Sequence, residues 1–196
     1  MQVNGNVSGR KIQAAVPNML TASRLVFTVF FLIYMDALLV VKGCALAALL
    51  LFACICITDY YDGRLARKLG AATNAGAIFD AATDCIYVWS SVFLLVLFDV
   101  VPIWFLVLVV YKFVEFLVTS HIFKARDPQQ KKPLVFDPTG KAAAILFFLL
   151  PGASCIAFNI TDIPQMFIIW CLIAAASALA VYSSIKRIGS VMKAFA

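Results

Sequence analysis

The sequence predicts an all-α integral membrane protein with six transmembrane helices, preceded by a short N-terminal interfacial helix. Of its 196 residues, 64% are hydrophobic and only 13% are charged. The apolar residues fall into six runs, and about 20 apolar residues suffice for a helix to cross a bilayer. The basic residues gather in alternate loops. This pattern is typical of membrane proteins rather than soluble domains, and we expect membrane lipids but no nucleic acid as partners.

The chain is expected to form one membrane domain over residues 1–196. Residues 10–19 could form the interfacial helix, which we expect to break at Pro17 because proline lacks the amide donor. The six apolar runs that follow set the expected spans, with approximate ends. They cover residues 20–41, 43–61, 77–98, 100–122, 141–160 and 163–185.

The distribution of charge predicts the orientation in the membrane. Nearly all lysines and arginines lie in the N-terminal segment, the 62–76 and 123–140 loops and the C-terminal segment, whereas the opposite loops carry only Lys42. Basic loops remain on the cytoplasmic side of a membrane. The sequence therefore predicts a multi-pass protein of the cell membrane with cytoplasmic termini, and some of these bases are expected to touch anionic lipid.

Acidic residues concentrate in the segment "TDYYDGRLARKLGAATNAGAIFDAATD", residues 58–84. It holds Asp59, Asp62, Asp80 and Asp84. An aspartate within a membrane helix costs about 2.5–3.5 kcal/mol on insertion scales, so such residues are rare and usually functional. The simpler interpretation is that the acids face water at helix ends. It suits Asp59 and Asp62 but not Asp80 and Asp84, which begin an apolar span.

The spacing of these acids predicts that they converge. Asp59 and Asp62 are three residues apart, and Gly76, Asp80 and Asp84 follow at intervals of four, so each set shares one helical face. The short connection should make the two helices antiparallel neighbours, and small residues between them permit close approach. The acids then meet at the cytoplasmic end.

Converging carboxylates repel one another unless cations neutralise them. Oxygen ligands suit Mg²⁺ or Mn²⁺, and a pair of such ions is a common arrangement for phosphoryl chemistry. Arg67 lies a little beyond Asp62 and can bind phosphate through two parallel hydrogen bonds. These residues predict a metal-dependent site that acts on a phosphorylated substrate.

The pattern D59-x-x-D62-G63-x-x-A66-R67-(x8)-G76-x-x-x-D80-x-x-x-D84 resembles the signature of the CDP-alcohol phosphatidyltransferases at every fixed position. The preceding "PNMLTASR", residues 17–24, resembles the segment that opens bacterial members. The resemblance implies transfer of a phosphatidyl group from a CDP-lipid such as CDP-diacylglycerol to a small alcohol, with release of CMP. It also implies a homodimer whose site opens to the cytoplasmic leaflet.

The resemblance further implies a role for each signature residue. Two divalent ions would be held by Asp59, Asp62, Asp80 and Asp84. Asp80 and Asp84 would be catalytic residues, and Asp84 would take the proton of the alcohol. The nucleotide would be contacted by Gly63, Ala66, Arg67, Gly76 and Asp62. From the first span, Thr21 and Arg24 could also reach the nucleotide, although Arg24 could instead extend to the membrane surface.

The acceptor alcohol is expected to be glycerol 3-phosphate, with inositol, inositol phosphate and serine as alternatives. Lys112 and Glu115 lie three residues apart within a span, either as an ion pair that fixes helix packing or as a wall of the acceptor pocket. Lys124, Arg126 and Lys141 lie toward the cytoplasmic side. Together with Lys112 they are candidates to bind a phosphorylated acceptor.

A protein of another class, a small transporter for divalent cations or protons, could also use four aspartates. A conduction path needs polar groups across the full depth of the membrane. Here the acids gather near one face of the membrane, which favours an enzyme over a transporter.

Overall fold

The computed structural model describes residues 4–41, 44–68, 73–126, 137–159 and 165–195. Within these ranges the secondary structure is six helices without a strand, which confirms the predicted all-α fold. The helices are α1 (Asn4–Val41), α2 (Ala45–Lys68), α3 (Asn74–Leu97), α4 (Ile103–Arg126), α5 (Pro138–Asn159) and α6 (Gln165–Phe195).

Five of these helices, α1 and α3 to α6, contain segments long and apolar enough to cross a membrane. In α2 the apolar segment is shorter and runs from Ala45 to Tyr61. The chain is therefore an integral membrane protein, as the composition predicts. Each expected span overlaps one helix, so the apolar runs locate the elements correctly.

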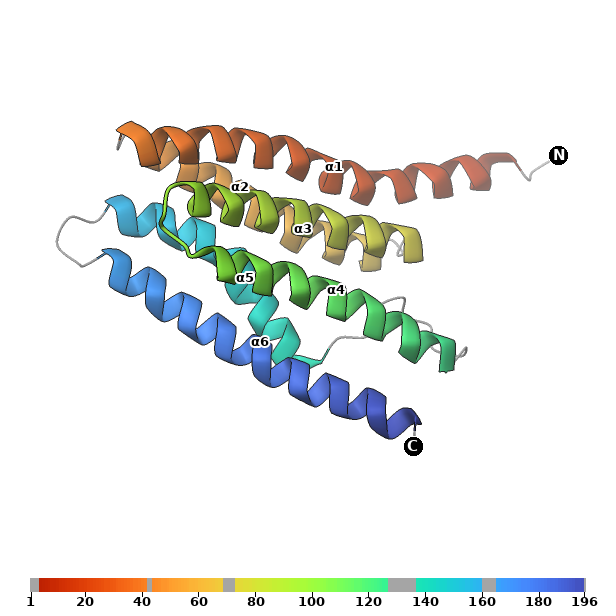
Figure 1. The fold of residues 1–196 in the computed structure, drawn as a ribbon. Helices are drawn as coiled ribbons and strands as arrows, with labels where there is room; N and C mark the ends of the chain where they lie inside the picture. The colour runs from red at the N-terminus through yellow and green to blue at the C-terminus, as the bar shows by residue number, and fades with distance from the viewer. Residues whose placement is uncertain (1–3, 42–43, 69–72, 127–136, 160–164, 196) are drawn as a thin grey trace.

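The start of the chain differs from the expectation in one respect. Residues 10–19 are helical, but they belong to α1, which continues through Pro17 instead of breaking there. A proline removes one backbone hydrogen bond and can be accommodated within a helix. Figure 1 shows the N-terminal part of α1 extending past the ends of the neighbouring helices.

Consecutive helices run in opposite directions, so the N-terminal ends of α1, α3 and α5 and the C-terminal ends of α2, α4 and α6 share one end of the bundle (Figure 1). α1 packs against both α2 and α3, and α5 packs against α6. α2 and α3 contact each other through side chains, because Phe52 on α2 stacks on Tyr87 on α3 with 6.5 Å between ring centroids. Acids of the two helices also meet near one end of the bundle.

Aromatic rings fill the middle of the bundle. Tyr87 on α3 lies 4.8 Å from Phe148 on α5 and 5.6 Å from Phe31 on α1, measured between ring centroids. Phe52 on α2 completes this group and lies directly against Gly152. One aromatic core thus joins α1, α2, α3 and α5.

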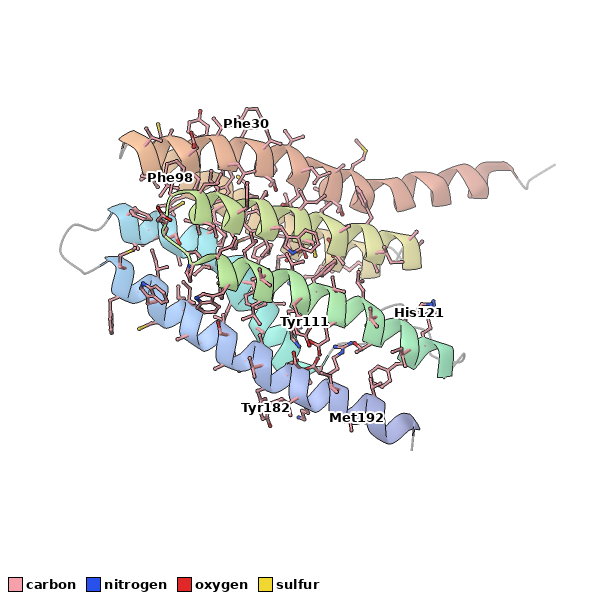
Figure 2. All side chains as sticks on the ribbon, in the orientation of Figure 1. Phe30, Phe98, Tyr111, His121, Tyr182 and Met192 are labelled. Atoms are coloured by element: carbon pink, nitrogen blue, oxygen red, sulfur yellow. The ribbon has the colours of Figure 1, made fainter. Side chains whose placement is uncertain are left out.

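Large apolar side chains also cover the outside of the bundle, as expected for a surface that faces lipid. Phe30 on α1 and Tyr182 on α6 point away from opposite sides of the molecule (Figure 2). Both are exposed, as is Met192 near the end of α6. Several polar side chains, including those of Arg24, Lys112 and Arg187, are buried inside the bundle.

Candidate active site

Three aspartates from two helices converge near the end of the bundle that carries both termini. Asp59 belongs to α2, and Asp80 and Asp84 lie one turn apart on α3. Thr73 caps α3, with its hydroxyl accepting a hydrogen bond of 3.0 Å from the backbone N–H of Gly76. One oxygen from each carboxylate lies within 4.8 Å of the others. The predicted convergence is therefore confirmed for these three residues, which we call the acidic cluster.

The acidic cluster is only partly exposed. The side chains of Asp59, Asp80 and Asp84 are 41%, 37% and 33% exposed, respectively. Like charges at this separation repel, and partial burial strengthens the repulsion because protein screens charge less than water does. The cluster therefore requires positive charge.

Arg24 on α1 supplies one positive charge from within the protein. Its side chain is fully buried, and Nη2 lies 3.1 Å from Asp59 while Nη1 lies 3.0 Å from Asp80. Nη1 also donates to Asp84 and, at 3.4 Å, to the hydroxyl of Thr83. One guanidinium thus contacts all three carboxylates, and the possibility that it extends to the membrane surface is wrong.

The acidic cluster fits a hard divalent cation. Its donors are carboxylate oxygens alone, the set that Mg²⁺ and Mn²⁺ prefer. When all three carboxylates are ionised, one guanidinium leaves the cluster with a net negative charge. Asp59, Asp80 and Asp84 are therefore the described residues that could hold such an ion.

The remaining signature residues are located less completely. The side chains of Asp62, Gly63, Ala66 and Arg67 lie outside the described residues, so only their place in α2 is known. Gly76 lies in the first turn of α3. Thr21 is buried on α1, three residues before Arg24. Nucleotide binding by these residues and metal binding by Asp62 stay predictions.

A pocket of about 190 Å³ opens beside the acidic cluster, among α3, α4, α5 and α6. Asp84 lines this pocket and also contacts Arg24, so it faces both regions. Most of the pocket wall is apolar and includes several phenylalanines. The polar side chains of the wall are Asp84, Cys85, Lys112, Asp137 and Arg187.

Arg187 on α6 makes several polar contacts beside this pocket. Its Nη1 lies 2.9 Å from Asp137, and its Nε and Nη2 donate to the hydroxyls of Thr119 and Ser120 on α4. Ser183, one turn earlier on α6, donates to Asp137 at 2.8 Å. The start of α5 is thereby tied to α4 and α6.

Asp137 is an acceptor for several donors at once. Burial alone would raise its pKa, but hydrogen bonds from Thr139, the backbone N–H of Gly140, Ser183 and Arg187 lower the pKa to about 2. The carboxylate is therefore ionised at neutral pH and holds Arg187 in place.

The ion-pair alternative for Lys112 and Glu115 is confirmed, whereas a place in the wall of an acceptor pocket stays a prediction. They form a buried ion pair of 2.9 Å within α4, and Lys112 also donates to Ser183 and Ser184 on α6. At the same time Lys112 lines the pocket. The pair fixes helix packing and places an ammonium at the pocket wall.

The other predicted acceptor residues are not brought to this pocket. Lys124 and Lys141 are exposed and are absent from its wall as far as the structure describes it, and the side chain of Arg126 lies outside the described residues. Sequence reasoning missed Asp137. The spacing of Ser183 and Arg187, one turn apart on an apolar helix, is a signal that could have indicated a polar face.

The fold and the site define an integral membrane protein that carries a carboxylate cluster beside a pocket. The profile of the CDP-alcohol phosphatidyltransferase family matches residues 14–182, and the chain belongs to this family.

Several curated relatives match part of the chain. A CDP-diacylglycerol–glycerol-3-phosphate 3-phosphatidyltransferase of Bacillus subtilis is 32% identical over 54% of this chain and 58% of its own. A probable phosphatidylglycerophosphate synthase of Mycobacterium tuberculosis is 37% identical over 54% of this chain and 51% of its own. A probable CMP-forming cardiolipin synthase of Drosophila melanogaster is 29% identical over 66% of this chain and 40% of its own. The chain thus spans about half the length of the curated relatives it matches.

Proposed function

We propose that this protein transfers a phosphatidyl group from CDP-diacylglycerol to a small polar alcohol and releases CMP in a reaction that depends on Mg²⁺ or Mn²⁺. The observation that carries the proposal is the position of Asp84, which belongs to the acidic cluster and lines the adjacent pocket. A group in this position can face a donor at the cluster and an acceptor in the pocket. Membership of the family supports the same donor.

The proposed reaction is a single displacement at phosphorus. The alcohol oxygen forms a bond to the phosphorus nearest the lipid, the bond from that phosphorus to the CMP oxygen breaks, and Asp84 accepts the proton of the alcohol. Divalent ions bound to Asp59, Asp62, Asp80 and Asp84 would neutralise the pyrophosphate and stabilise CMP as it leaves. The apolar pocket wall would limit the access of water to the phosphorus.

Glycerol 3-phosphate is the acceptor we propose first. The Bacillus subtilis and Mycobacterium tuberculosis relatives, named as a glycerol-3-phosphate phosphatidyltransferase and a probable phosphatidylglycerophosphate synthase, support this choice. Within the pocket, Arg187 and Lys112 provide the cationic groups, and an arginine binds phosphate through paired hydrogen bonds. Both bases are already paired with acids, so the acceptor phosphate would have to replace at least one of these contacts.

An acceptor panel tests this assignment. Purified protein, CDP-diacylglycerol and Mg²⁺ would be combined with glycerol 3-phosphate, inositol, inositol phosphate or serine, and CMP release would be measured. We expect glycerol 3-phosphate to give the fastest release. Faster release with another acceptor would overturn the acceptor assignment, whereas no release with any acceptor would contradict the transfer reaction.

A lipid alcohol is a second candidate acceptor, and the mostly apolar pocket wall favours it. The cardiolipin synthase among the relatives is consistent with such a product. Phosphatidylglycerol in mixed micelles would be a further arm of the same panel. A rate with phosphatidylglycerol above that with glycerol 3-phosphate would favour the second candidate.

A covalent route is the mechanistic alternative, in which an aspartate attacks phosphorus before the alcohol does. Labelled CMP incubated with protein and CDP-diacylglycerol distinguishes the two routes. A single displacement predicts no label in the CDP-lipid without acceptor. Rapid incorporation of label would show an intermediate on the protein.

We propose that the protein is a homodimer of the cell membrane with its termini and site on the cytoplasmic side. The concentration of basic residues at that end supports the orientation, and the family resemblance supports the dimer. Labelling of introduced cysteines in intact cells and chemical cross-linking in membranes would test the two statements separately.

A further inference from the structure

Arg24 contacts the same three carboxylates that are available to a metal ion. Its Nη1 and Nη2 contact one Oδ1 atom each of Asp59, Asp80 and Asp84. These carboxylates are the acidic cluster that could hold a divalent cation. A guanidinium that contacts all three therefore competes for the ligands that an entering ion needs.

The burial of Arg24 makes this contact strong. Its side chain is 0% exposed, so the guanidinium has exchanged water for carboxylates. The helix around it is also fixed, because the hydroxyl of Thr28 donates to the backbone carbonyl of Arg24 at 2.8 Å. Without a positive charge in this position, the three carboxylates would repel one another in a partly buried setting.

We propose that Arg24 is a positioning residue that holds the acidic cluster together as an internal cation, and that a divalent ion binds by displacing its guanidinium from those oxygens. One positive charge is exchanged for two, so the net negative charge of the cluster falls. This inference rests on the metal dependence proposed above. It adds that the metal-free protein is stabilised by Arg24 and that metal affinity is limited by Arg24.

Removal of the arginine charge should therefore tighten metal binding. Arg24→Gln keeps a polar side chain of moderate length but removes the positive charge. We expect the dissociation constant for Mn²⁺ to fall by about tenfold or more. A change of this size is typical when two groups compete for one site. Arg24→Lys keeps the positive charge but lacks the planar guanidinium that reaches three carboxylates. Its dissociation constant for Mn²⁺ should therefore lie between those of the wild type and Arg24→Gln.

The experiment uses the full chain in detergent and Mn²⁺ alone. Free Mn²⁺ would be counted by electron paramagnetic resonance, and thermal unfolding would be followed with and without the ion. For Arg24→Gln we expect a lower unfolding temperature without Mn²⁺ and a larger rise when Mn²⁺ is added. This readout does not depend on catalytic turnover.

Two control variants separate the outcomes. Arg187→Gln removes the other buried arginine, which contacts Asp137 and not the cluster, and should lower stability without tightening Mn²⁺ binding. Asp59→Asn should weaken Mn²⁺ binding, which would locate the ion at the cluster. If wild type and Arg24→Gln both fail to bind Mn²⁺, the metal dependence in the proposed function fails.

If Mn²⁺ binds but Arg24→Gln binds it no more tightly than wild type, only the inference about Arg24 is overturned. Weaker binding would assign Arg24 the opposite role, that of supporting the metal-bound form. If Arg24→Gln cannot be purified without Mn²⁺, Arg24→Lys decides the question by the same comparison, and binding no tighter than wild type again overturns the inference.

Discussion

Arg24 and Arg187 are both buried within the bundle, but the charge around them differs. Arg24 contacts three carboxylates, whereas Arg187 contacts one carboxylate, Asp137, and hydroxyl groups. Together with the Lys112–Glu115 ion pair, Arg187 and Asp137 form a region in which two bases face two acids. Among the described residues, the acidic cluster thus has more acids than bases and attracts cations, whereas acids and bases are equal in number in the α4–α6 region, so that an anion must displace an acid there.

The largest expected effect comes from removing one negative charge of the cluster. Asp80→Asn removes an ionised metal ligand, and we expect CMP release from CDP-diacylglycerol to fall below detection. Asp36→Asn is the matched control, because Asp36 is exposed near the opposite end of α1 and should leave turnover unchanged. Normal turnover by Asp80→Asn would contradict the metal assignment.

The next largest effect should come from the α4–α6 region. Arg187→Gln would remove the paired hydrogen bonds that we propose for an acceptor phosphate, and charge-assisted bonds of this kind are worth about 1.5–3 kcal/mol. We expect the KM for glycerol 3-phosphate to rise by about tenfold or more, with a smaller change in the KM for CDP-diacylglycerol. Lys186→Gln, at the exposed neighbouring position, should change neither constant. Equal changes in both constants would indicate a general structural defect.

A packing change can disturb the α4–α6 region without altering its charge. A methyl group at Gly140 would lie 2.5 Å from Oδ1 of Asp137 and 2.9 Å from the hydroxyl of Ser183. Gly140→Ala should therefore separate these groups and cost about 1–3 kcal/mol through poorly satisfied hydrogen bonds. Thermal unfolding in detergent would measure the loss.

Gly189→Ala is the control for that substitution. A methyl group there meets no atom within 4 Å, and Gly189 lies within α6. Alanine is the better helix former, so this variant should gain about 0.5–1 kcal/mol. The same substitution is thus expected to have opposite signs at the two positions, and a similar change at both would contradict the assigned contacts of Gly140.

The smallest effect near neutral pH concerns Asp137. Its pKa in the folded protein is about 2, below the ordinary 3.8, so the ionised form stabilises the fold. This contribution is fully present above the unfolded pKa of 3.8 and is lost as the pH falls toward 2. At neutral pH, Asp137→Asn should therefore be less stable than the wild type. As the pH falls from 3.8 toward 2, the variant should lose less stability than the wild type does. Identical acid profiles for the variant and wild type would contradict the assigned hydrogen bonds.

The sequence predicts the acidic cluster better than the region beside it, for a physical reason. Asp80 and Asp84 share one face of a helix by spacing alone, and the short 62–76 connection brings Asp59 to the same end. Arg24 is far from them in sequence, so its contact depends on how α1 packs, which periodicity does not determine. That packing places α1 against both α2 and α3.

The α4–α6 region was harder to predict because its parts come from three separate segments. Asp137 precedes α5, and its position in the sequence indicates a loop residue. Its hydrogen-bond donors Ser183 and Arg187 lie on α6, 46 and 50 residues later in the sequence. Lys124 and Lys141 were better candidates by charge alone, yet both face outward. The helices themselves were predictable apart from the start of α1, because each contains an apolar run.

The central claim is that Asp59, Asp80 and Asp84 together hold divalent cations used in phosphatidyl transfer. An anomalous-scattering map from crystals grown with Mn²⁺ and CDP-diacylglycerol tests this claim most directly. We expect a peak among these three carboxylates, within about 2.0–2.6 Å of their oxygens, and next to the pyrophosphate of the donor. A bound donor with no peak at these residues, or with its peak elsewhere in the bundle, would contradict the account.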